Sequence, residues 1–335
     1  MESLKVVIPM AGLGTRLRPH TWSRPKQLIS VAGKTVLDHV LDTLSTLNGF
    51  TEIELVNIVG YLGDQLETYI TSNYPQFKSQ FVVQENPRGQ SHAVYLAREH
   101  LQGPMMIIFA DTIIETDLSF LASESADAVV WVKPVPDPRR FGVTEVTEDG
   151  WVKQMIEKPQ QMDKNLAVVG FYYFHQAEAL LAAIEEQMAR EIQLKGEYYL
   201  VDAINLMLDE GLQMRTKHVD TWLDAGTPAA LLETNRYLLE NGHSNQDEGP
   251  CKDNAVFIPP VYMHPTAQVA NAIVGPHVSI GADSCVESSI ISNSILEDSA
   301  QVEGAILTGS LIGKRAIIKR RAGEVNAGDN TVVLI

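Results

Sequence analysis

The sequence is poor in cysteine, contains no long apolar run and has no broad excess of positive charge. Cys251 and Cys285 are the only two cysteines in 335 residues, and their spacing indicates neither a disulfide framework nor a zinc site. No apolar run approaches the length of a membrane span, and the chain opens on a strand-like run rather than a signal peptide, which predicts a cytoplasmic protein without a membrane partner. The net charge of −16 argues against a nucleic-acid partner, because such surfaces need an excess of Lys and Arg.

From Leu4 to about Leu239, strand-like apolar runs alternate with helical patterns. The expected strands are 5–10, 52–61, 79–84, 104–111 and 127–135, and the expected helices are 36–47, 62–74 and 91–100. This alternation predicts an α/β domain with a mainly parallel sheet covered by helices on both faces. Ligands of such folds bind at the carboxyl ends of strands. Gly12, Gln84 and Asp111 all follow expected strands, so we expect the site there.

The pattern of residues changes in the last part of the chain. A polar, Gly- and Pro-containing stretch at 240–260 is typical of a linker. After it, aliphatic residues recur every five or six positions: Val274, Ile280, Val286, Ile291, Leu296, Val302, Leu307, Ile312 and Ile318. This period favours a β-helix over an ordinary antiparallel β domain. The predicted division is 1–240 for a catalytic domain, 241–258 for a linker and 259–335 for the β-helix.

A glycine loop lies near the N-terminus, in VVIPMAGLGTRLRPHTWSRPKQL. Gly12 and Gly14 allow a tight turn whose N–H groups attract anions. Four cations follow within a short distance: Arg16, Arg18, Arg24 and Lys26. Leu17 stands where a dinucleotide fingerprint needs its third glycine, and Leu28 stands where a P-loop needs its first, so both motifs are excluded. What remains is either a loop that holds a nucleoside triphosphate or a plain strand-to-helix turn with solvated cations.

Carboxylates also follow apolar runs elsewhere in the chain. Asp111 closes MMIIFAD and Asp224 lies in TWLDAGT, and two such aspartates facing a phosphate loop outline a Mg²⁺ site, although each alone is equally a cap or turn residue. Glu157 and Lys158 in EKP are either a solvated hairpin or a carboxylate for sugar hydroxyls beside an ammonium for a phosphate. Lys195 precedes a helix in KGEYYLVDAI as a cap or a polar contact.

Taken together, these motifs resemble one family. AGLGTRLRPHTWSRPK, VVQENPRGQSHA, FAD, DPRRFGVTEV, EKP, NLAVVG, GEYYLVDAI and WLDAGTP run in order through the chain and are similar to the sugar-1-phosphate nucleotidylyltransferases. The greatest similarity is to the long form of glucose-1-phosphate thymidylyltransferase, which implies a Rossmann-like domain with a mixed, mainly parallel sheet followed by a left-handed parallel β-helix.

The resemblance implies a role for individual residues. Ala11, Gly12, Gly14 and Thr15 would wrap the nucleotide phosphates, with Arg16 and Lys26 as catalytic cations. Gln84 and Gly89 would face a pyrimidine base. Gly142, Glu157, Lys158, Gly170 and Lys195 would face the sugar phosphate, with Lys195 where the family often has Arg. Asp111 and Asp224 would bind Mg²⁺, the implied cofactor.

The implied reaction transfers the nucleotidyl group of a nucleoside triphosphate to a sugar 1-phosphate, with glucose 1-phosphate as the expected sugar, and releases pyrophosphate. Gln84 can hydrogen-bond to either thymine or uracil, so dTTP and UTP both stay open, and a UTP-dependent glucose-1-phosphate uridylyltransferase is the alternative. Two other classes also stay open. One is a bifunctional enzyme with acetyltransferase activity on the β-helix, using His264 or His277 as base, and the other is a non-catalytic subunit that senses NDP-sugars. The apolar faces of such a coil favour a homo-oligomer.

Overall fold

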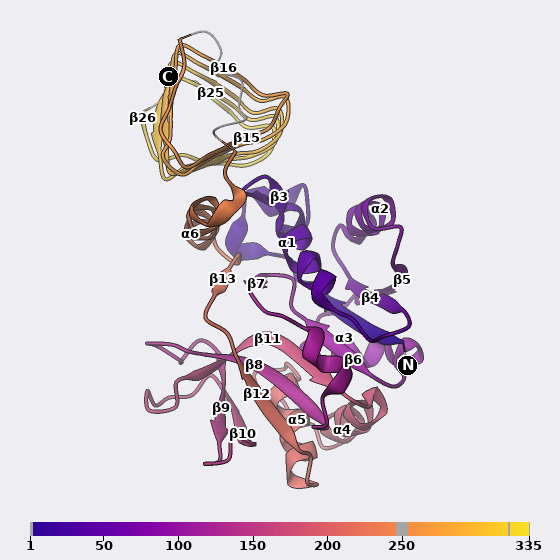
Figure 1. Cartoon of the computed structure of the whole chain (residues 1–335). Coiled ribbons are helices and arrows are strands. Elements are labelled where there is room, and N and C mark those ends of the chain that lie inside the picture. The colour runs from indigo at the N-terminus through magenta and orange to yellow at the C-terminus, as the bar shows by residue number, and fades with distance from the viewer. Residues whose placement is uncertain (1–2, 246–253, 321, 335) are drawn as a thin grey trace. The chain divides into compact units, whose positions relative to one another are not determined.

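The computed structural model describes residues 3–245, 254–320 and 322–334, so residues 246–253 of the expected linker lie outside it (Figure 1). Contacts within the chain divide it into two compact units. One comprises Met1–Gly12 and Val40–Trp222, and the other comprises Leu13–His39 and Leu223–Ile335. The basic segment after the glycine loop therefore packs within the same unit as the C-terminal coil, far away in the sequence. The boundaries at 240 and 259 stay a prediction.

The first unit is built on a nine-stranded mixed sheet with strand order β10-β9-β11-β6-β1-β4-β5, in which β8 also pairs with β11 and β12 pairs with β8. Strands β6, β1, β4 and β5 are parallel, whereas β11 runs antiparallel to β6 and β8. The strands are β1 (Leu4–Pro9), β4 (Ile53–Val59), β5 (Lys78–Val83), β6 (Met105–Ile108), β8 (Ala128–Pro134), β9 (Gly142–Val146), β10 (Val152–Glu157), β11 (Leu166–Phe174) and β12 (Met214–His218). The predicted mixed sheet is confirmed.

Helices bury the apolar residues of this sheet. They are α2 (Gly63–Asn73), α3 (Gln90–Leu96), α4 (Ala177–Ala189) and α5 (Leu200–Asp209). Val7, Ile107 and Val130 of the sheet share one core with Leu180 of α4 and Ile204 of α5. Because the central strands are covered on both faces, their sequences are continuous apolar runs rather than alternating ones.

Two of the expected helices are shorter than their patterns. Helix α1 spans Val36–Asp42 and continues as a 3₁₀ turn at Thr43–Thr46, and α3 is followed by another at Arg98–His100. Thr43 and Thr46 donate side-chain hydrogen bonds to carbonyls three residues earlier, at Val40 and Thr43. Such local bonds compete with regular helical geometry, which explains why the helix tightens there.

The C-terminal part of the second unit is a parallel β-helix, as predicted. Its strands form three five-stranded parallel sheets, β14-β17-β20-β23-β26, β15-β18-β21-β24-β27 and β16-β19-β22-β25-β28. Figure 1 shows them as the sides of a triangle. All nine aliphatic residues that define the sequence period are buried inside the coil.

The strands of the coil are short. They are β14 (Val256–Phe257), β15 (Val261–Met263), β16 (Gln268–Ala270), β17 (Ile273–Val274), β18 (Val278–Ile280), β19 (Cys285–Glu287), β20 (Ile290–Ser292), β21 (Ser294–Leu296), β22 (Gln301–Glu303), β23 (Ile306–Thr308), β24 (Leu311–Ile312), β25 (Ile317–Lys319), β26 (Ala322–Gly323), β27 (Asn326–Ala327) and β28 (Val332–Val333).

Residues 13–39 and helix α6 (Pro228–Leu238) complete the second unit. The segment contains a small hairpin of β2 (Ser30–Val31) and β3 (Lys34–Thr35). Asn235 of α6 joins hairpin and coil, because its Oδ1 accepts hydrogen bonds from the Ala32 amide at 2.9 Å and from Ser279 Oγ at 2.6 Å. Two further short strands adjoin the predicted carboxylates. Strand β7 (Thr112–Ile114) begins directly after Asp111, and β13 (Trp222–Asp224) ends at Asp224.

Candidate active site

Gln84 lies directly after β5, at the carboxyl end of a parallel strand, as predicted. Its side chain is buried, and its backbone amide donates to Val59 O at 2.8 Å. Gln84 Nε2 lies 3.1 Å from His92 Nδ1. Burial lowers the pKa of His92 and the nearby Arg88 acts in the same direction, so the imidazole is neutral and Nδ1 accepts the amide proton. This contact fixes the amide and leaves its oxygen as an acceptor for a ligand.

Gly89 holds two segments of the first unit unusually close together. Its φ is +101°, and a Cβ built there would lie 2.5 Å from both the N and the O atoms of Tyr198. On either side of this contact, Tyr198 N donates to Arg88 O at 2.9 Å and Ser91 N donates to Tyr198 O at 3.0 Å. Only glycine permits this approach. The loop after Gln84 is therefore attached to the segment that begins with Lys195.

Glu157 and Lys158 of EKP form a polar cluster with Tyr199. Glu157 ends β10, and Lys158 Nζ lies 3.2 Å from its Oε1 and 3.1 Å from the Tyr199 hydroxyl. Burial raises the pKa of Glu157, against the opposing effect of Lys158. Burial alone would lower the pKa of Lys158, but the Tyr199 hydroxyl and the Glu157 carboxylate raise it, so the ammonium stays charged. The Glu157 side chain is only 14% exposed, whereas that of Lys158 is 46% exposed and reaches solvent.

Of the remaining residues predicted for the sugar phosphate, Gly142 lies beside this pair. A Cβ on Gly142 would lie 3.2 Å from Glu157 Oε2, so this glycine leaves room for the carboxylate. Gly170 has a φ of +86° and sits at an irregularity of β11, where a Cβ would meet Phe109 at 3.2 Å. Lys195 is exposed in a turn with φ +53°, two residues before Glu197. Asp202, on α5, is half-buried, and burial raises its pKa.

The glycine loop continues into 3₁₀ turns and not into an α-helix. These turns span Thr15–Leu17, His20–Trp22 and Lys26–Leu28, so the alternative of an ordinary strand-to-helix turn does not describe the segment. Gly14 has a φ of +62°, and a Cβ there would lie 3.0 Å from Thr21 Cγ2 and 3.3 Å from Lys26 Cβ. The loop backbone and Lys26 are thus adjacent. Thr21 Oγ1 fixes this fold of the loop by donating to Gly14 O at 2.8 Å.

Ala11 and Gly12 form the end of the glycine loop that belongs to the first unit. Ala11 is buried, and a Cβ on Gly60, the residue after β4, would lie 2.9 Å from Ala11 O. Gly12 is exposed, with open space where a Cβ would stand. Its backbone is therefore accessible, whereas Gly60 is needed so that the neighbouring strand end can approach the loop.

Arg16 and Asp224 flank Gly226 in the second unit. A Cβ on Gly226 would lie 2.9 Å from Arg16 Nη2 and 2.9 Å from Asp224 Oδ1. Asp224 Oδ1 accepts the Gly226 amide proton at 2.7 Å, which orients the carboxylate, and both Arg16 and Asp224 are exposed. Asp111 is half-buried and follows β6 in the first unit.

Several residues of these clusters escape sequence reasoning. Gly60, His92, Tyr199 and Gly226 acquire their roles only through contacts between segments. Gln27 is another, because its side chain is buried next to Lys26 and neither its Oε1 nor its Nε2 has a hydrogen-bond partner among the described residues. A buried amide in that state is a candidate ligand group. Its one sequence signal is its position directly after Lys26.

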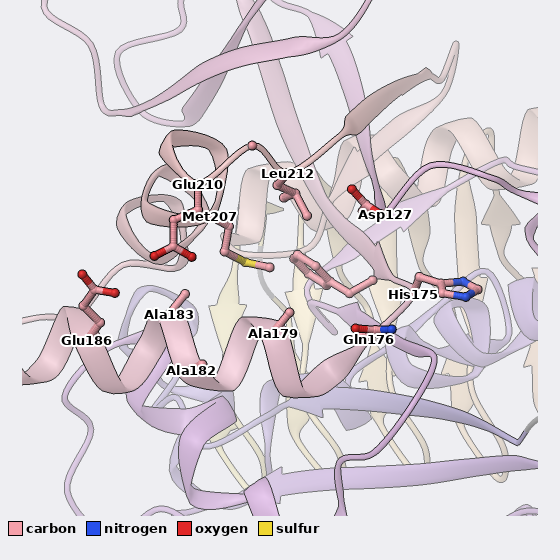
Figure 2. Close-up of a pocket in the computed structure, with 12 residues that line it drawn as sticks. Asp127, His175, Gln176, Ala179, Ala182, Ala183, Glu186, Met207, Glu210 and Leu212 are labelled. Atoms are coloured by element: carbon pink, nitrogen blue, oxygen red, sulfur yellow. The ribbon is translucent and has the colours of Figure 1, made fainter.

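A cavity of about 450 Å³ lies elsewhere in the first unit, between α4 and the turn after α5 (Figure 2). Asp127, His175, Glu186 and Glu210 surround an apolar floor of alanines, Met207 and Leu212, and none of the predicted site residues lines it. Asp127 already accepts the Gln213 amide at 2.9 Å, and Glu186 pairs with Arg190. We do not assign the candidate site to this cavity.

Comparison with known proteins agrees with the motifs. The family model described as Nucleotidyl transferase matches residues 5–241, more than half of the chain. The chain belongs to the nucleotidyl transferase family.

Within the described residues, no helix is long and apolar enough to cross a membrane.

Relatives of this family match most of the chain. A low-salt glycan biosynthesis nucleotidyltransferase of Haloferax volcanii is 32% identical over 87% of this chain and 86% of its own length. A glucose-1-phosphate thymidylyltransferase of Streptomyces griseus is 29% identical over 85% of both chains. Among solved structures, a putative glucose-1-phosphate thymidylyltransferase of Bacillus anthracis in complex with a sucrose has a TM-score of 0.60 at 26% identity, covering 70% of this chain and 94% of that one. The predicted family and enzyme class are confirmed.

The close approach at Gly89 is tested by Gly89→Ala with Gly211→Ala as a matched control. Both glycines have φ near +100°, but a Cβ on Gly211 meets nothing within 4 Å. Both variants carry the backbone strain of about 1–2 kcal/mol, and Gly89→Ala adds about 1–3 kcal/mol because the Tyr198 backbone must move. Denaturant unfolding measures the difference, and equal losses of stability in the two variants would show that the contact is unimportant.

Proposed function

We propose that this nucleotidyl transferase moves a nucleotidyl group from dTTP or UTP to a sugar 1-phosphate, with glucose 1-phosphate as the first candidate. The observation that carries the proposal is the polar cluster of Glu157, Lys158 and Tyr199. A charged ammonium held between a carboxylate and a phenol suits a sugar phosphate, with the cation on the phosphate and the carboxylate on hydroxyls. The attachment of Gly89 to Tyr198 supports a site in which nucleotide and sugar bind to connected segments.

The proposed reaction needs no general base. An oxygen of the sugar phosphate attacks the α-phosphorus in line, a new P–O bond forms, and the bond to pyrophosphate breaks. The nucleophile is already anionic, so alignment and charge supply the rate. We assign the triphosphate to Ala11, Gly12, Gly14 and Thr15, with Arg16 and Lys26 as its cations. Gln84 and Gly89 are assigned to the base, and Gly142, Gly170 and Lys195 to the sugar-phosphate side.

We further propose Mg²⁺ as cofactor, held by Asp111 and Asp224. The donor types fit, because both are carboxylates and Asp224 keeps one oxygen outside its bond to Gly226. The described residues contain no group of three His, Cys, Asp or Glu side chains placed to hold a metal, which suits an ion completed by phosphate oxygens and water. Bound Mg²⁺ would neutralise charge on the reacting phosphates.

For the assembly we propose a homo-oligomer in which a second copy covers one face of the coil. Val256, Ile273, Ile290 and Ile306 pair in register across β14, β17, β20 and β23, and all four side chains are exposed. An in-register row of exposed aliphatic residues is typical of a contact surface. A cytoplasmic location is supported by Cys285, which is a free and exposed thiol.

The function is tested by pyrophosphate release from a grid of five nucleoside triphosphates and several sugar 1-phosphates with Mg²⁺. We expect turnover with dTTP or UTP and a hexose 1-phosphate. Release of CoA from acetyl-CoA in the presence of an amino-sugar phosphate is the matching assay for an acetyltransferase on the coil. Binding of NDP-sugars without turnover would identify a sensor. Absence of pyrophosphate release throughout the grid would contradict the proposal.

Asp111→Asn and Asp224→Asn test the metal ligands. Each change removes a negative oxygen ligand while keeping the shape, so turnover should fall about 10³-fold, as expected when several kcal/mol of transition-state stabilisation are lost. Turnover is measured over a Mg²⁺ titration, and thermal unfolding without metal should match the parent protein. Parent-like turnover in either variant would remove that residue from the metal site.

Lys158→Ala tests the sugar-phosphate assignment, with the exposed Lys153→Ala in β10, the strand that ends just before Lys158, as control. Loss of a charged hydrogen bond should raise KM for the sugar phosphate about 10–100-fold while KM for the nucleotide changes little. The control should leave both constants unchanged. A rise confined to the nucleotide KM would show that Lys158 contacts the nucleotide and would contradict its assignment to the sugar phosphate.

The oligomer is tested by Ile290→Arg combined with Ile306→Arg, and Gln301→Arg on another face of the coil is the control. Two charges on the aliphatic row should prevent it from being covered by a second copy. Light scattering after size-exclusion chromatography should show a smaller particle for the double variant and the parent mass for the control. An unchanged mass in the double variant would contradict this assignment of the face.

A further inference from the structure

The carboxylate of Glu297, on the β-helix, is completely buried, and its partners come from the basic segment near the N-terminus. Arg24 Nη1 donates to Glu297 Oε2 at 3.0 Å, Arg24 Nη2 lies 3.0 Å from Oε1, and the Ser30 amide donates to Oε1 at 2.9 Å. Burial raises the pKa of Glu297, and Arg24 and the Ser30 amide oppose that rise. This two-pronged geometry is specific to a guanidinium.

Further contacts of Arg24 and of two residues before it continue the same attachment. His20 Nε2 lies 2.6 Å from Asn326 Oδ1, Ser23 Oγ donates to Asp329 Oδ2 at 2.6 Å, and Arg24 Nη2 lies 3.5 Å from Asp329 Oδ1. Burial lowers the pKa of His20, so this imidazole is neutral in its contact. Gly328 completes the fit, because a Cβ there would meet Pro19 at 2.9 Å.

Arg24 is tied directly to the position of Lys26. Only Pro25 separates them, and the ring of a proline restricts the backbone. Arg24 Nη1 also donates to Leu28 O at 3.2 Å, which closes the 3₁₀ turn that carries Lys26. Lys26 Cβ in turn lies against Gly14, as described above. The coil, Arg24, Lys26 and the glycine loop therefore form one continuous chain of contacts within the second unit.

A buried ion pair is a poor source of stability, because the cost of desolvating two charges offsets their attraction. A buried ion pair can instead serve to fix one geometry of the chain. Of the four cations near the glycine loop, Arg24 is thus bound to protein carboxylates, while Arg18 lies 5.8 Å from the centre of the Trp22 ring. The guanidinium of Arg24 is therefore held by protein carboxylates.

We propose that Glu297 and Arg24 are positioning residues for nucleotidyl transfer, through which the β-helix holds the turn of Lys26 and the glycine loop in the geometry that binds the triphosphate. The coil is then a structural part of the nucleotide site as well as a surface for assembly. This inference rests on the proposed function.

The test uses the full chain with Glu297→Gln, which keeps the shape and removes the charge. We expect KM for the nucleotide to rise about 10-fold and kcat to fall about 10-fold, because a small misplacement of a reacting group is costly, while KM for the sugar phosphate stays within about two-fold. Hydrogen–deuterium exchange of peptides covering 13–35 should become faster, and nucleotide should restore less protection than in the parent.

Two controls separate positioning from stability. Leu307→Ala removes a buried residue of the coil away from Arg24 and should lower the melting temperature without changing nucleotide KM. Glu303→Gln breaks an exposed ion pair with Lys319 on the coil and should change neither. Arg24→Lys should recover part of the nucleotide affinity lost in Arg24→Gln, since it restores charge without the two-pronged bond.

If Glu297→Gln does not fold, Ser23→Ala combined with Asp329→Asn removes the Ser23 contact and the second carboxylate beside Arg24 but keeps Glu297, and should raise nucleotide KM about two- to three-fold. A parent protein that releases no pyrophosphate contradicts the proposed function. An active parent whose Glu297 and Ser23/Asp329 variants keep the parent's nucleotide KM and exchange rates contradicts the positioning role. A rise in nucleotide KM in Leu307→Ala equal to that in Glu297→Gln also contradicts it.

Discussion

A carboxylate without access to water requires a cation and hydrogen-bond donors, and Glu297 meets that constraint with Arg24 and Ser30. The consequence is a link between two parts of the chain that lie more than 250 residues apart in sequence. Because Arg24 precedes Lys26 by two residues, the constraint on one cation also limits where the next one can lie. The glycine loop is held in turn, because Gly14 packs against Lys26 and Thr21 and accepts a hydrogen bond from the Thr21 hydroxyl.

The first unit depends on backbone contact in a comparable way. Gly89 lies against the Tyr198 backbone at a distance that any side chain would prevent, and Lys158 contacts the Tyr199 hydroxyl. The segment of Tyr198 and Tyr199 therefore reaches both Gln84's loop and the Glu157–Lys158 pair. Rigid elements position these loops, since Gln84 follows β5 and Glu157 ends β10. The side chains proposed for recognition are thus held in place by contacts with neighbouring segments.

Much of this fold was predictable because its signals are local. Continuous apolar runs mark the covered parallel strands, and Val302, Leu307 and Ile312 show the coil's period directly. Gly14, Lys158 and Asp224 were predictable as site candidates from motifs. The contacts that organise them were not, because Glu297 looks like any solvated glutamate in a repeat and His92 like any polar helix residue. Their roles depend on burial and on partners far away in sequence, which no local pattern encodes.

The partners of Arg24 show the same dependence on distant contacts. The sequence places four cations near the glycine loop without distinguishing Arg24 from the others, and in the fold Arg24 is bound to Glu297 and Asp329 of the coil. Residues 13–39 accordingly belong to the compact unit of the β-helix. A deletion of the coil would therefore expose a buried cation next to Lys26, and it is not a neutral truncation of a separate domain.

The most direct test of this account is a double-mutant cycle between Glu297→Gln and Lys26→Ala, read as kcat/KM for the nucleotide. If the coil acts through the turn of Lys26, the Glu297 substitution should cost much less when Lys26 is already absent, with a coupling energy of about 1 kcal/mol or more. Effects that add within about 0.3–0.5 kcal/mol would contradict the account.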